Sequence, residues 1–64
     1  MTENELIQEL YKIQDLWSEQ PHLANDYSEG LRFNELRNEL KSLHNITAEF
    51  EFNSTENKYV LVLK

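Results

Sequence analysis

The chain has no cysteine and a single glycine, and each shortage excludes a class of structure or chemistry. Without cysteine the fold forms without a disulfide bond, and no Cys-based zinc site is possible. Gly30 is the single glycine, whereas the loops that cradle phosphate groups need several glycines. We therefore expect side-chain packing, rather than a covalent or metal crosslink, to stabilise this small chain.

Long apolar runs are also missing. No segment approaches the roughly 20 apolar residues that a membrane-spanning helix needs. Residues 1–5 are acidic, whereas a secretory signal begins with basic residues and continues into an apolar run. We therefore expect a cytoplasmic protein that does not associate with membranes.

Basic residues are scarce relative to acidic ones. Six Lys and Arg stand against twelve Asp and Glu, and the net charge is -6. Such a surplus of negative charge repels phosphate backbones, so direct binding to nucleic acid is disfavoured. The same charge favours another protein with a basic surface as the partner.

The apolar residues that are present recur at the spacing of two amphipathic helices. The two stripes consist of Leu6, Leu10, Ile13 and Trp17, and of Phe33, Leu36, Leu40 and Leu43. They predict one helix over residues 3–19 and another over residues 28–44. Thr2 and Glu5 have the spacing of a capping box at the first helix, Pro21 ends that helix, and Asn45 suits a left-handed end to the second.

The last twenty residues have the pattern of a β-hairpin. Residues 46–52 alternate apolar and polar side chains, a polar loop follows, and residues 58–63 form a second strand. Two strands alone are marginally stable in water, so the helices must cover one face. The sequence thus predicts a single small α+β domain over residues 1–64, with two antiparallel helices packed on one face of a C-terminal β-hairpin (ααββ). We expect its core to contain Leu10, Ile13, Trp17, Leu36, Leu40, Phe50 and Leu61.

The second strand is apolar on both faces, although two helices can cover only one face. Val60 and Val62 would then be left on the outer face. The edge of this strand would also lack hydrogen-bond partners, and only Lys58 and Lys64 protect it with charge. We therefore predict that something covers the strand, either a second copy in a homodimer that pairs its C-terminal strands or a strand from another protein.

Residues with catalytic or metal-binding chemistry are few and lack a recognised spacing. His22 and His44 have no serine or acid partner at the spacing of a catalytic site. His22 and Asp26 could share a helical face as metal ligands, but a turn histidine beside a capping aspartate is the much simpler interpretation. His44 suits the negative end of the second helix. We expect no enzyme activity, no cofactor and no metal.

Two pairs of residues are candidates for contact with a partner in addition to Val60 and Val62. Tyr27 and Leu31 are one turn apart and would face away from the core if the second helix begins early. Glu49 and Glu51 point the same way from a strand, about 7 Å apart, which is close to the spacing of phosphates along a nucleic-acid strand. This pair indicates a possible DNA mimic that occupies a basic groove, with an ordinary solvated strand face as the alternative.

One segment has a local likeness to a known family. Residues 30–40, Gly-Leu-Arg-Phe-Asn-Glu-Leu-Arg-Asn-Glu-Leu, resemble the first helix of the helix-turn-helix in some winged-helix regulators, and a hairpin follows as a wing would. The resemblance implies a DNA-binding regulator. The recognition helix that should come next is absent from the pattern, so the chain would be a degenerate member.

These observations predict a non-catalytic, small, acidic protein-binding module. A cysteine-free acidic chain of this length is typical of an inhibitor or adaptor from a phage or mobile element. The alternatives are a DNA-mimic protein, a structural homodimer and a degenerate winged-helix regulator.

Overall fold

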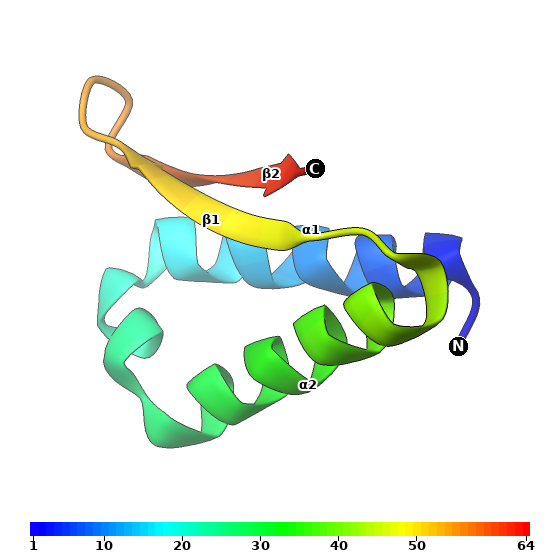
Figure 1. Ribbon diagram of the computed structural model, residues 1–64. Coiled ribbons are helices and arrows are strands. Elements are labelled where there is room, and N and C mark those ends of the chain that lie inside the picture. The colour runs from blue at the N-terminus through cyan, green and yellow to red at the C-terminus, as the bar shows by residue number, and fades with distance from the viewer.

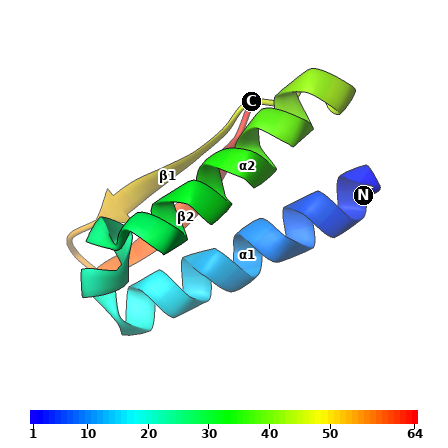
Figure 2. The ribbon, with the colours of Figure 1, turned by 90° about the horizontal axis from the view of Figure 1, so that it is seen from below.

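The computed structural model describes all 64 residues and shows two antiparallel helices beneath a two-stranded antiparallel hairpin (Figure 1). The elements are α1 (Glu3–Glu19), a 3-10 helix (Pro21–Asn25), α2 (Tyr27–His44), β1 (Ala48–Asn53) and β2 (Lys58–Leu63). Both helices lie on the same face of the hairpin, β2 mainly against α1 and β1 against α2 (Figure 2). The predicted α+β class and the ααββ order are confirmed.

The helix ends follow from local hydrogen bonds. The Thr2 hydroxyl accepts from the Glu5 amide and the Glu5 carboxylate accepts from the Thr2 amide, both at 3.2 Å, which is the predicted capping box. The Asp26 carboxylate accepts from two amides at the start of α2, so this helix begins at Tyr27 rather than residue 28. Asn45 ends α2 in the left-handed conformation, with φ 56°.

The hairpin is shifted slightly from the predicted bounds. β1 begins at Ala48 rather than residue 46, because the Ile46 amide still bonds to the Leu40 carbonyl at the exit of α2. In the loop, the Asn53 side chain accepts from the Thr55 and Glu56 amides. β1 and β2 then pair with Ala48 opposite Leu63 and Asn53 opposite Lys58.

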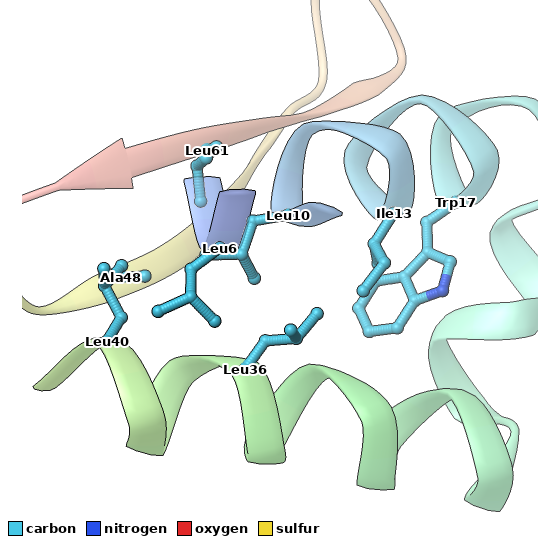
Figure 3. Close-up of a cluster of buried hydrophobic side chains, with 8 residues drawn as sticks. All are labelled: Leu6, Leu10, Ile13, Trp17, Leu36, Leu40, Ala48 and Leu61. Carbon is cyan, nitrogen blue, oxygen red and sulfur yellow. The ribbon is translucent and has the colours of Figure 1, made fainter. Parts of the chain in front are cut away.

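The core lies between the helices and the inner face of the hairpin (Figure 3). Its eight buried residues are Leu6, Leu10, Ile13, Trp17, Leu36, Leu40, Ala48 and Leu61. Six of the seven predicted core residues are among them. The seventh, Phe50, is only half-buried, because β1 lies at an open edge of the sheet. Leu43 was placed on the apolar face of α2 but is 62% exposed, since the helix has passed the end of the core at that point.

An aromatic cluster joins α1, α2 and the hairpin at one end of this core. Trp17 of α1 contacts Phe33 of α2 and Phe50 and Tyr59 of the hairpin, with ring centroids 5.3–6.0 Å away. Phe33 and Phe50 stack at 4.7 Å. Trp17 therefore links α1 to both α2 and the hairpin, which also contact each other through the stack of Phe33 on Phe50.

Candidate protein-interaction surface

The hairpin has an outer face that neither helix covers (Figure 1). Side chains alternate along a strand, and the inner face carries Ala48 and Leu61. Glu49, Glu51, Val60 and Val62 therefore share the outer face, where Glu49 is opposite Val62 and Glu51 is opposite Val60. Val60 is 37% exposed and Val62 is half-buried. The structure thus brings together four of the six residues that the sequence singled out for partner contact.

The charges around this face are partly paired. Lys64 lies 3.4 Å from the Glu49 carboxylate, and Lys58 lies 2.7 Å from the carboxylate of Glu56 in the loop. The hydrogen bond from Lys58 to Glu56, together with their Coulombic attraction, raises the pKa of Lys58. Glu51 has no ion-pair partner. The outer face is therefore an apolar strip of two valines with a charged rim in which Glu51 is the free carboxylate.

The edge of β2 is closed at the amides of Tyr59 and Leu61, which corrects the expectation that the whole edge would be unpaired. The Gln14 side chain of α1 accepts from the Leu61 amide at 2.7 Å, and the Ser18 hydroxyl accepts from the Tyr59 amide at 2.9 Å. Ser18 also donates to the Gln14 carbonyl at 2.8 Å, which orients its hydroxyl. Two polar side chains one helical turn apart thus occupy two backbone donors along the edge. Lys58 and Lys64 are not its only protection.

The hydrogen bond between the Leu61 amide and the Gln14 side chain can be tested by mutation. We expect Gln14→Ala to lower stability by about 1 kcal/mol, because the Leu61 amide loses its acceptor. Hydrogen exchange of that amide should become faster by about five-fold, which is the same free energy expressed as a rate ratio. Gln8→Ala is the matched control, since Gln8 is exposed on the same helix. Equal protection of the Leu61 amide in both variants would contradict the role of Gln14.

The edge of β1 is open. Lys64 and Thr47 exchange both of their backbone hydrogen bonds, so in this antiparallel pair every second residue from Thr47 bonds across the hairpin. The backbone groups of Phe50 and Phe52 therefore point away from β2, and no backbone or side-chain group bonds to them. Phe52 is 49% exposed. The two edges of one small sheet are therefore unequal, because side chains of α1 bond to two amides of β2 and no group bonds to Phe50 or Phe52 of β1.

The pair Tyr27 and Leu31 forms a separate surface on α2. Tyr27 is 80% exposed and Leu31 is 44% exposed. They lie one turn apart on the helix, away from the buried side chains Leu36 and Leu40, as predicted for an early helix start. The structure does not bring this pair together with the outer face of the hairpin, because the core of the protein lies between them.

One carboxylate of α1 forms an ion pair with α2. Glu9 contacts Arg32 of α2 at 2.5 Å and Lys12 of its own helix at 3.2 Å. The Lys12 hydrogen bond and charge, with a smaller contribution from Arg32, lower the pKa of Glu9. This stabilisation is present above the ordinary pKa of a glutamate and is lost as the pH falls through the lowered value. Glu9 therefore contributes to the contact between α1 and α2.

The structure places the histidines and the aspartate that were considered for catalysis or metal binding at the two ends of α2 and on the 3-10 helix before it. His22 is exposed on the 3-10 helix, and the Asp26 carboxylate is engaged in capping α2. His44 is half-buried in the last turn of α2, and its Nε2 has no hydrogen-bond partner. No group of three or more His, Cys, Asp and Glu has the geometry of a metal site, and no pocket is found.

Neither helix is sufficiently long and apolar to cross a membrane.

Comparison with protein-family models, curated proteins and solved structures finds no match to this chain. The local resemblance to a winged-helix regulator is limited by the connection after α2. Residues 45–47 lead directly from that helix into β1, so no recognition helix follows. The candidate site consists of the outer face of the hairpin and the open edge of β1.

Proposed function

We propose that this chain is a non-catalytic protein-binding module that acts as an inhibitor or adaptor of another protein. The observation that supports it is the outer face of the hairpin, which neither helix covers and where Val60 is 37% exposed and Val62 half-buried between charged residues. An apolar centre with a polar rim is the usual anatomy of a protein interface. A phage or mobile element is the source that we propose for a small acidic inhibitor of this kind.

The charge of the chain supports a partner with a basic surface. The net charge is -6, and Glu51 is a free carboxylate beside the valine strip. Complementary charge speeds the encounter of two proteins and selects against like-charged competitors. The same charge opposes binding to a phosphate backbone.

DNA mimicry is a second candidate, favoured by the observation that Glu49 and Glu51 share one face of β1. Their spacing of about 7 Å along the strand is similar to that of successive phosphates. Lys64 offsets the charge of Glu49, so the mimic would depend chiefly on Glu51. In this case the partner is a nucleic-acid-processing enzyme with a basic groove.

The proposal predicts a salt-dependent interaction. A partner isolated on the immobilised chain should bind more weakly as salt rises, because exposed charges are screened over about 8–10 Å at physiological ionic strength. Glu49→Gln/Glu51→Gln should reduce the association rate more than it raises the dissociation rate, as measured by surface plasmon resonance. The control is Glu19→Gln/Glu35→Gln, which removes the same charge from exposed helix positions without an ion pair.

The outcomes separate the candidates. Equal kinetics for the two double variants would contradict the role of the outer face. A nucleic-acid-processing enzyme as the partner would favour mimicry, and salt-independent binding would exclude it. A chain that captures only itself, and that sediments as a dimer, would replace the proposal by the structural homodimer.

A further inference from the structure

We propose that β1 accepts an extended segment of the partner protein as a third strand, and that this segment alternates basic with apolar residues. The inference rests on the proposed function and specifies how the partner is recognised. It follows from the inequality of the two sheet edges and from the charges that flank the open one.

The open edge offers the backbone groups that strand addition requires. The amides and carbonyls of Phe50 and Phe52 face outward from β1 and have no partner in the chain. An added strand bonds to such groups through its own backbone, whatever its side chains are. Ala48 is fully buried, so the accessible part of the edge begins beyond it. Two outward-facing residues suit a segment of about five residues.

The edge of β2 does not compete for this segment. Gln14 and Ser18 already occupy the amides of Leu61 and Tyr59, so an added strand would have to displace both side chains. α1 also packs beside β2, whereas β1 lies at the free margin of the sheet (Figure 2). Strand addition is therefore directed to β1.

The residues on the two faces of β1 select the side chains of the segment. On the outer face the nearest neighbours of the added strand are Glu49 and Glu51, which favour Lys or Arg directly opposite them. On the helix-facing side the neighbours are the rings of Phe50 and Phe52, and Phe52 is half exposed. These rings favour apolar residues. Because side chains alternate in a strand, the complementary segment alternates basic and apolar positions.

The same charges oppose a second copy of the chain at this edge. If two β1 strands paired across a two-fold axis at Phe50, Glu49 and Glu51 of one copy would lie opposite Glu51 and Glu49 of the other, and an axis at Glu51 would place the two Glu51 side chains opposite each other. Like charges directly opposite one another destabilise a strand pair. Lys64 is the only base that forms an ion pair with either of them, and it pairs with Glu49. The segment therefore comes from a different, basic protein.

The test uses the intact chain and three synthetic peptides of equal length, together with the partner isolated above. One peptide alternates Lys and Val, one has the same composition with Lys and Val in separate blocks, and one alternates Glu and Val. We expect the alternating Lys peptide to bind at least ten-fold more tightly than the other two. We also expect it to slow hydrogen exchange of the Phe50 and Phe52 amides by at least ten-fold, as measured by NMR.

A pair of variants isolates the backbone donor. Phe52→Pro removes both the ring and the outward amide, whereas Phe52→Ala removes the ring and keeps the amide. We expect Phe52→Pro to bind the Lys peptide and the partner at least ten-fold more weakly than Phe52→Ala. The amide exchange of the unmodified chain provides a measurement that does not depend on how well either variant folds.

The results distinguish this inference from the proposed function. If the partner binds with the predicted salt dependence but leaves the Phe50 and Phe52 amides unprotected, strand addition is overturned and the protein-binding function stands. Equal binding of the block and alternating peptides would also overturn it. If neither a partner nor any peptide binds, the proposed function fails together with the inference.

Discussion

Replacement of Leu40 by alanine is expected to lower the free energy of unfolding by about 2–5 kcal/mol and to leave much of the chain unfolded at 25 °C. Leu40 is fully buried and projects from α2 toward Ala48, with Leu6 close by (Figure 3). Removal of its branched end leaves a cavity that the surrounding side chains fill only partly. A chain of this size buries about 60% of its unfolded surface, so it has little stability to lose.

Leu43→Ala is the matched control for this effect. It changes the same residue type in the same helix, but Leu43 is 62% exposed. We expect it to change stability by less than about 0.5 kcal/mol, as is usual for surface substitutions. Urea denaturation followed by far-UV circular dichroism measures both variants. Equal destabilisation by the two would show that the inner face of α2 is assigned incorrectly.

Replacement of Trp17 by alanine is expected to cost about 3–5 kcal/mol. Trp17 is 6% exposed, and its ring contacts Phe33, Phe50 and Tyr59. Its removal therefore loosens α1 from both α2 and the hairpin, rather than weakening a single contact. Thermal unfolding by circular dichroism should show the change as a large fall in Tm.

Two comparisons identify the cause of that loss. Tyr27→Ala removes an aromatic ring that is 80% exposed and should have little effect on Tm. Trp17→Phe keeps an aromatic ring in the cluster and also removes the buried Nε1, which has no hydrogen-bond partner. We expect Trp17→Phe to destabilise the chain much less than Trp17→Ala. A similar fall in Tm for Trp17→Phe and Trp17→Ala would contradict this expectation. It would mean that the presence of an aromatic ring at this position is not sufficient to stabilise the cluster.

Most of the fold is predictable because its determinants are local. A helical stripe such as Leu6, Leu10, Ile13 and Trp17 has one interpretation over seventeen residues, and the caps at Thr2 and Asn45 act within one turn. The first strand begins at Ala48, two residues later than predicted, because the Ile46 amide bonds backward to the Leu40 carbonyl. Such a bond depends on how the helix exit is folded, and it has no signature in the pattern.

The candidate surface was predictable in part for the same reason. Alternation alone placed Glu49 with Glu51 and Val60 with Val62, and helical spacing alone placed Tyr27 beside Leu31. Phe50 was expected in the core because its face of the strand is apolar. The alternation pattern assigns a face to a side chain, but it does not show how far that part of the strand extends beyond the helices.

The sequence by itself therefore determined the elements, their order and the face to which each side chain belongs, because these depend on contacts within a few residues. Only the tertiary structure decided which edge of the hairpin is open. Gln14 and Ser18 lie more than forty residues before the amides that they accept from, as the separations of 47 and 41 residues show. In the sequence they are two ordinary polar residues beside an apolar stripe. They close β2 and leave β1 open because α1 packs beside β2, and that arrangement is a property of the whole fold.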